Sequence, residues 1–431
     1  MAAGAAVPVS RRLLLDTAPL RNPAYRRLWI GHGVSFIGFQ VTAVAVPVQV
    51  YEMTGSSFWV GVLGMVNLVP LVVFGLWGGA VADHMDRRRL LLASSVLTWV
   101  ATLGLFAQAL LGLELLWLIM LVVALQATGF AISSPTRGAI IPRLFPLDEV
   151  AAANTLSYTF SQAATLGGPL LAGLVLARWD YSWAYGLDMV LFTVMLWAAF
   201  RLPPIPPLAG EEVQGSPGLR SVLEGLRFLW TQPVLLMSFV VDIIAMGVAM
   251  PRALFPELAD TRFGGDEAVG WLFAAIGIGA VLGGLFSGWI GRVRRQGLAL
   301  VVSIVVWGLA VAAAGLQHSL WAAIALLAVG GAADLVSAVF RQTILQTYAP
   351  DELRGRIQGV FTVVVAGGPR LGDLRAGVMA VAFGAGVSWV FGGLACAVLV
   401  ALVGLASPAL MRYRPNVSDS GPEGRSPEQV T

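Results

Sequence analysis

Twelve apolar stretches, each long enough to cross a lipid bilayer, follow one another along this chain and restrict the folds that it can adopt. Hydrophobic residues make up 57% of the sequence and charged residues 12%, and the mean hydropathy is +0.80. A transmembrane helix needs about 20 apolar residues, whereas a water-soluble core does not need such runs. Only helices and closed barrels satisfy their backbone in lipid, and these runs lack the alternation of barrel strands. The sequence therefore predicts an all-α membrane protein with 12 transmembrane helices.

One long polar segment divides the predicted spans into two groups of six. In chain order the spans are expected at 27–50, 58–82, 89–112, 115–136, 156–178, 182–201, 235–257, 269–291, 298–317, 320–342, 357–383 and 388–410. We therefore expect a short N-terminal segment, a first six-helix half, a linker that contains an amphipathic surface helix, a second six-helix half and a disordered tail, at 1–24, 25–201, 202–234, 235–411 and 412–431.

All 27 basic residues of the chain are arginine, and they concentrate in alternate connections between the predicted spans. The other set of connections holds only Arg178 and Arg262. Basic residues favour the cytoplasmic side of a membrane, so both termini, the linker and the tail are predicted to be cytoplasmic.

The composition also excludes several kinds of catalytic site. Without lysine the chain can form neither a P-loop nucleotide site nor a Schiff base. Its one cysteine, Cys396, lies in an apolar run, which leaves no disulfide and no cysteine metal site. The three histidines lie far apart in sequence. We expect a protein that is not an enzyme and holds no metal.

The two predicted halves repeat several sequence features at an offset of roughly two hundred residues. The segment 134–137 resembles 339–341, and Gly167 to Gly173 resembles 367–372. The polar turn at 79–90 has a weaker counterpart at 288–295. Two six-helix halves in parallel repeat are typical of major facilitator transporters.

Two motifs carry a resemblance to that superfamily over about residues 20–410. Gly79, Asp83, Arg87 and Arg88 match its loop pattern G-x-x-x-D-[RK]-x-G-[RK]-[RK], with histidine at 84 and aspartate at 86 as departures. Gly168-Pro169 with Gly173 resembles the fifth-helix motif of the drug/proton antiporter branch, with alanine at 172 where a glycine is typical. The string at 135–154 looks most like the enterobactin-exporter and macrolide-efflux subgroup.

The resemblance implies a secondary transporter that works by alternating access in the bacterial cytoplasmic membrane. It would export an amphipathic small molecule, such as a drug, a siderophore or a natural product, in exchange for protons. The proton gradient is then the energy source, and we expect no cofactor, no nucleic-acid partner and a monomer. A proton-coupled importer is one alternative. A non-transporting membrane sensor or scaffold is an alternative from another class.

The loop motif predicts a gate. Asp83 follows a helix that is expected to end inside, and Arg354 and Arg356 open the eleventh span. A carboxylate near a helix N-terminus gains roughly 0.3–1 kcal/mol, so Asp83 would dock there and lock the outward-open state. The alternative is a solvated turn anchored by arginines. The expected gating residues are Gly79, Asp83, Arg87, Arg88, Arg354 and Arg356.

Charges inside the predicted spans of the second half are the next signal, because an ionised group at mid-membrane normally faces a cavity or a partner. Arg370 and Asp373 are close enough on one helix to pair, and Arg341 is expected to reach the headgroups. A static, neutralised pair is the alternative to a proton carrier. The proton-coupling candidates are Asp242, Asp334 and Asp373.

The first half offers amides rather than acids, since its first span has no acid in its middle. These amides either line a cavity or bond between helices. The substrate-cavity candidates are Gln40, Asn67, Gln126, Arg252 and Arg370.

A bend is expected in span five, where it would let a neighbouring helix approach closely. The candidate residues for this bend are Gly167, Gly168, Pro169 and Gly173.

Overall fold

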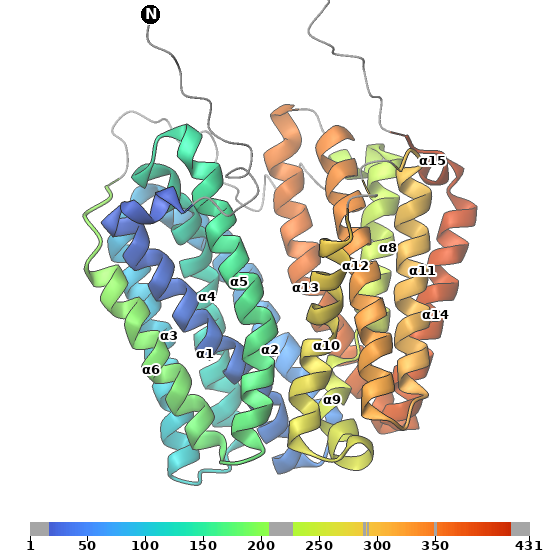
Figure 1. The fold of residues 1–431 in the computed structure, drawn as a ribbon, viewed down its shortest axis with the longest axis horizontal. Coiled ribbons are helices and arrows are strands. Elements are labelled where there is room, and N and C mark those ends of the chain that lie inside the picture. Colours follow the sequence, from blue (N-terminus) through green and yellow to red (C-terminus); the bar gives the residue numbers. More distant parts are fainter. Residues whose placement is uncertain (1–16, 207–226, 288–289, 291–292, 349–350, 415–431) are drawn as a thin grey trace, which may run out of the picture.

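The computed structural model describes residues 17–206, 227–287, 290, 293–348 and 351–414, with side chains described except at 76–84, 147–148, 151, 346–348, 351–363 and 366. Helices make up almost all of this part of the chain (Figure 1). The first half consists of α1 (Pro23–Thr54), α2 (Ser57–His84), α3 (Arg87–Leu110), α4 (Leu116–Leu144), α5 (Leu147–Leu176) and α6 (Tyr181–Phe200), preceded by the short η2 (Ala18–Arg21).

The second half begins with α8 (Pro233–Ala249), followed by the short η3 (Arg252–Leu254), α9 (Phe255–Leu258) and η4 (Ala259–Phe263). Its remaining helices are α10 (Asp266–Leu285), α11 (Gln296–Gly315), α12 (Leu320–Tyr348), α13 (Asp351–Phe383), α14 (Ala385–Ala406) and the short α15 (Pro408–Met411). Most of the expected linker helix, and most of the expected tail, lie outside the described residues.

Within the described residues, eleven segments are long and apolar enough to cross a membrane. The twelfth long helix is α13, which has 33 residues and carries Arg370, Asp373 and Arg375. The predicted all-α fold with twelve long helices is confirmed.

The seventh span differs from the continuous helix that the sequence predicts. It runs from Pro233 to Phe263, but α8 ends at Ala249 and short helical turns follow from Arg252 onward. Pro251 lies at the break, and its ring nitrogen has no hydrogen to donate to a continuing helix. The break places Arg252 in a turn rather than in a regular span.

Helix starts in the first half are fixed by polar caps. Asn22 accepts from the backbone amides of Ala24 and Tyr25 at the start of α1. Asp86 accepts from two amides at the start of α3, and Asp180 does so at the start of α6. Each cap satisfies amides that the first turn of a helix leaves without partners.

The two halves repeat one packing pattern. In the first half, α1 packs on α5 and α6, and α4 packs on α2 and α3. In the second half, α8 packs correspondingly on α13 and α14, and α12 packs on α10 and α11. The sequence repeats at 134–137 and 339–341 therefore fall on equivalent helices, α4 and α12.

The bundle has two distinct ends. Every positive-φ residue among those described is a glycine at one end, which we call the turn end: Gly55, Gly112, Gly264, Gly265 and Gly384. The starts of α1 and α8 and the short α15 lie at the opposite end, which we call the terminal end (Figure 1).

The halves meet at the turn end where glycines bring the backbones of facing helices into direct contact, a contact region that we call the seam. There α2 packs on α13, and α5 packs on α10. A Cβ added to Gly173 of α5 would lie 2.9 Å from the Cα of Gly270 on α10, and one added to Gly377 of α13 would meet the backbone of Ser57. The Ser57 hydroxyl also donates to the carboxylate of Glu257 in the second half. Toward the terminal end the ribbons of the two halves diverge (Figure 1).

Candidate substrate cavity and its charged residues

A cavity of about 360 Å³ lies between the two halves. The structure brings all five predicted cavity residues to its wall together with Asp373: Gln40, Asn67 and Gln126 from the first half, and Arg252, Arg370 and Asp373 from the second. The remaining wall is mostly apolar and includes the rings of Phe39 and Phe273. The arrangement suits a solute with both apolar and polar parts.

Hydrogen bonds hold two of the amides in this wall. Gln126 of α4 donates from Nε2 to the Thr102 hydroxyl at 3.0 Å. Asn67 of α2 donates from Nδ2 to the Leu63 carbonyl of its own helix at 2.9 Å. Both amides line the cavity. Gln126 also bonds between helices, whereas the hydrogen bond of Asn67 lies within α2.

The arginines and the aspartate of the cavity do not form the predicted tight pair. No ion pair within 4 Å joins Arg370 to Asp373 among the described residues, and Arg370 Nε and Asp373 Oδ1 are buried without hydrogen-bond partners. Asp373 lies against the α2 backbone, where its Cβ would be 3.3 Å from a Cβ added to Gly64. The charges of Arg370 and Arg252 both act on Asp373. The described residues of the cavity wall thus include two guanidinium groups and one carboxylate.

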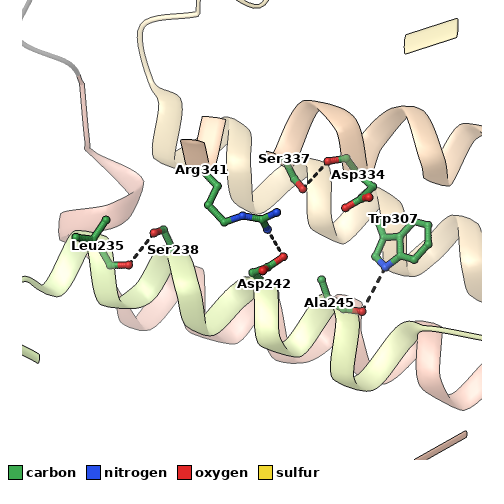
Figure 2. Close-up of polar contacts among 8 residues, drawn as sticks. All are labelled: Leu235, Ser238, Asp242, Ala245, Trp307, Asp334, Ser337 and Arg341. Atoms are coloured by element: carbon green, nitrogen blue, oxygen red, sulfur yellow. Dashed lines mark hydrogen bonds and ion pairs between the residues drawn. The ribbon is translucent and has the colours of Figure 1, made fainter. Parts of the chain in front are cut away.

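Arg341 does not reach toward the headgroups, which corrects the expectation from the sequence. Its residue is 5% exposed, and its guanidinium pairs with the carboxylate of Asp242 on α8. Figure 2 shows Arg341 of α12 pointing at Asp242 inside the second half. The side chain turns inward because an aspartate on the neighbouring helix supplies the opposite charge, and the charge of Arg341 also acts on Asp334.

Two further hydrogen bonds involve charged residues of the second half, one within α12 and one between α13 and α14. The Ser337 hydroxyl donates to the Asp334 carbonyl at 2.8 Å, which bonds two residues of α12 (Figure 2). Arg375 of α13 donates to the Ser388 carbonyl of α14 at 3.1 Å. Arg375 therefore joins two helices and is not among the residues that line the cavity.

Most of the predicted gate lies outside the described side chains, namely Gly79, Asp83, Arg354 and Arg356. The two gate arginines that are described contact the first half itself. The backbone amide of Arg87 donates to the Ile205 carbonyl at 3.0 Å. Arg88 donates from Nη2 to the Phe200 carbonyl at 2.6 Å, and its guanidinium lies 5.8 Å from the Phe200 ring. The Arg88 side-chain contacts suit the anchoring interpretation, whereas the described contact of Arg87 is made by its backbone amide.

The glycine–proline motif of α5 lies at close approaches on two sides. Gly168 faces Gln40 of α1 with no room for a Cβ. A Cβ added to Gly270 of α10 would lie 2.6 Å from the Pro169 carbonyl oxygen and 2.9 Å from the Gly173 Cα. Gly167 has no atom within 4 Å of the place a Cβ would take. The motif therefore forms part of the seam between the halves.

Sequence analysis missed one buried acid of the first half, Asp188 of α6. It is 0% exposed and accepts a hydrogen bond from the Thr42 hydroxyl at 2.7 Å. Thr42 itself lines the cavity. The sequence carries a signal for it, because Asp188 is the one charged residue between 181 and 200.

A second, small cavity lies nearer the terminal end of the first half. Its lining includes His32 of α1 and Arg137 of α4, so Arg137 faces the interior of the first half. Stacked phenylalanine rings lead from it toward the main cavity: Phe36 and Phe39 at 5.9 Å and Phe39 and Phe130 at 5.2 Å between ring centroids. Phe39 lines both cavities.

Comparison with known proteins settles which family this arrangement belongs to. Residues 15–429 match the family described as transmembrane secretion effector. The chain belongs to this family. It is therefore a multi-pass membrane transporter of the secondary type and not an enzyme.

Among its relatives is the enterobactin exporter EntS of Escherichia coli strain 536, which is 28% identical over 413 residues, or 95% of this chain and 98% of the relative. The EntS of Shigella boydii is 29% identical over 83% of this chain and 86% of the relative.

Solved structures confirm the major facilitator fold of the chain. The nucleoside transporter NupG superposes with a TM-score of 0.72 at 15% identity, over 91% of this chain and 100% of NupG. A bacterial homolog of the human lysosomal transporter Spinster, in an inward-facing and unoccupied conformation, superposes with a TM-score of 0.64 at 17% identity, over 92% of this chain and 97% of that structure.

Proposed function

We propose that this secretion effector is a proton-coupled exporter in the bacterial cytoplasmic membrane. Its substrate would be an amphipathic small molecule that carries an aromatic group and an acidic group. The observation that carries the proposal is the cavity between the halves, where, among the described lining residues, the two arginines Arg252 and Arg370 outnumber the one carboxylate, Asp373.

The substrate chemistry follows from the cavity wall. Guanidinium groups bind carboxylates and other planar anions with paired hydrogen bonds, and an excess of one such charge in an enclosed site favours an anion. The rings of Phe39 and Phe273 offer flat apolar surfaces beside these charges. Enterobactin, which the relatives' name gives as their cargo, is therefore a suitable first probe.

The conformation supports a cycle of alternating access. The halves are joined at the turn end and diverge toward the terminal end (Figure 1). The distribution of arginine favours a cytoplasmic terminal end. With that orientation the protein faces the cytoplasm, which is the state in which an exporter takes up its cargo.

The direction of transport is inferred from the family and from the seam. The family is described as secretion effectors, and two relatives are described as exporters. The glycine–proline motif that resembles the antiporter branch lies in the seam that seals the turn end. Protons moving inward through the same cycle would supply the energy for export.

Export can be tested with enterobactin and a panel of aromatic acids in cells with and without the chain, before and after the proton gradient is collapsed. We expect lower accumulation when the chain is present, and loss of that difference on collapse. An undiminished difference after collapse would argue against proton coupling. Higher accumulation in cells that carry the chain would argue for import.

A further inference from the structure

Asp188 is a carboxylic acid enclosed in the middle of the first half. One oxygen, Oδ2, accepts from the Thr42 hydroxyl at 2.7 Å, and the other, Oδ1, is buried with no hydrogen-bond partner. The carboxyl group packs on the bare backbone of α1 at Gly38, where an added Cβ would lie 2.6 Å from Oδ1. The site therefore has room for a carboxyl group and little else.

No cation in the described part of the surrounding helices faces this carboxyl group. Helix α6 packs on α1, α3 and α5. Between residues 90 and 110, α3 has no ionisable side chain. The ionisable side chains within 30–50 of α1, 152–176 of α5 and the rest of α6 are His32, Tyr158, Tyr181 and Tyr185. The Tyr185 hydroxyl donates to Gln49, and His32 lies by Ser161.

The aspartates of the second half differ in this respect. Asp242 forms an ion pair with Arg341, and two arginines act on Asp373. Those carboxylates are stabilised in their charged form by neighbouring guanidinium groups. Asp188 has only a hydroxyl, and an isolated ionised carboxylate in an apolar interior is so unfavourable that the group takes up a proton instead.

We propose that Asp188 is a proton-binding site of the first half and that the Thr42 hydroxyl connects it to the substrate cavity. Thr42 can serve as this connection because it both bonds to Asp188 and lines the cavity. On release, the Thr42 hydroxyl first turns its hydrogen toward the cavity, so that the protonated Oδ2 of Asp188 donates to Thr42 Oγ1. The O–H bond of the Asp188 carboxyl then breaks and its proton passes to Thr42 Oγ1. At the same time the hydroxyl passes its own proton to a water in the cavity, leaving a carboxylate and a hydronium ion. Uptake is the reverse transfer.

In the transport cycle, the conformation would decide which side of the membrane supplies the water that reaches Thr42. Protons taken up from outside and released inside would then be exchanged for cargo. This exchange role rests on the proposed function, whereas the binding of a proton at Asp188 does not.

Infrared spectroscopy of the purified full-length protein tests the site with the proton itself as the probe. A protonated carboxylic acid has a carbonyl absorption that a carboxylate lacks, and this band shifts when the acid exchanges its proton for deuterium. We expect Asp188→Asn to lose one such band. The matched control Asp180→Asn changes an exposed cap of the same helix and is expected to keep it. We expect Thr42→Val to keep the band and to slow its deuterium shift several-fold.

Each result bears on the proposal. A band that persists unchanged in Asp188→Asn would overturn the site, and an unchanged exchange rate in Thr42→Val would overturn the connection. If Asp188→Asn fails to fold, Thr42→Val provides the second test, because it removes the hydrogen bond to Oδ2 and should change the frequency of the band, so an unmoved band would count against the site. If the wild type exports its substrate in a proton-driven way but shows no band from Asp188, the proposed proton site is wrong and the proposed function stands. If the band is present but export is not driven by protons, the proposed function is wrong and the proton site stands.

Discussion

Asp242 of α8 and Arg341 of α12 form an ion pair inside the second half, with side chains that are 1% and 6% exposed. Ionised groups so far from water are stable only when they remain together. The pair therefore ties α8 to α12 inside the second half, and Asp242 is free to carry a proton only in a conformation that separates it from Arg341.

Removing one member of this pair should destabilise the protein. Asp242→Asn removes the carboxylate that pairs with the guanidinium of Arg341, and breaking a buried ion pair costs about 3–5 kcal/mol. We expect a clearly lower midpoint in thermal unfolding of the purified protein. The double variant Asp242→Leu with Arg341→Leu should recover most of the loss. An Asp242→Asn protein as stable as the wild type would show that the pair contributes little.

The cavity arginines should control binding of acidic substrates. A hydrogen bond to a charged group contributes about 1.5–3 kcal/mol, so Arg252→Gln and Arg370→Gln should each weaken binding of an acidic aromatic probe by roughly tenfold or more. Arg201→Gln removes the same charge from an exposed residue at the end of α6 and serves as the control. Equal affinities in all three variants would remove the proposed substrate chemistry.

A side chain in the seam should favour conformations that are open at the turn end. Gly270→Val places carbon atoms where the Pro169 carbonyl and the Gly173 backbone now lie, whereas Gly277→Ala on the same helix meets only Leu166 at 3.9 Å. A cysteine placed at Val60 in a Cys396→Ala background can report the opening through an impermeant maleimide added outside. We expect faster labelling with Gly270→Val than with Gly277→Ala. Identical labelling rates would mean that the seam does not limit opening.

The predicted gate can be tested separately, because binding and transport respond differently to it. If Asp83 locks the outward-open state, Asp83→Asn should keep the affinity of the wild type for its substrate and slow transport. Equilibrium binding and transport rate, measured on the same preparation, distinguish these effects. Unaltered turnover in Asp83→Asn would argue against the gate and for the alternative, in which the arginines of the loop anchor a solvated turn at the membrane surface.

The sequence predicts the architecture well because the bilayer imposes a simple length rule on apolar runs. It also groups Gln40, Asn67 and Arg252 as cavity candidates, because polar groups within membrane spans rarely face lipid, and all three line one cavity in the structure. It does not predict which charges meet. Arg341 and Asp242 are 99 residues apart, and their contact depends on how α8 and α12 rotate against each other.

Two other features depend on three-dimensional packing in the same way. The break after α8 follows from one proline, but the sequence does not show that the following turn brings Arg252 to the cavity. The close approach of Gly173 to Gly270 joins residues from different halves, and spacing within either helix gives no information about the other.

The seam between the halves also determines how the protein should respond to its surroundings. In the described residues it consists mainly of backbone in van der Waals contact, with the Ser57–Glu257 hydrogen bond as a polar addition. Contacts of this kind depend on shape and are not screened by dissolved ions. The resting balance between the two access states should therefore change little with ionic strength. It should instead respond to the lateral pressure of the bilayer, which acts on how closely two helices can approach.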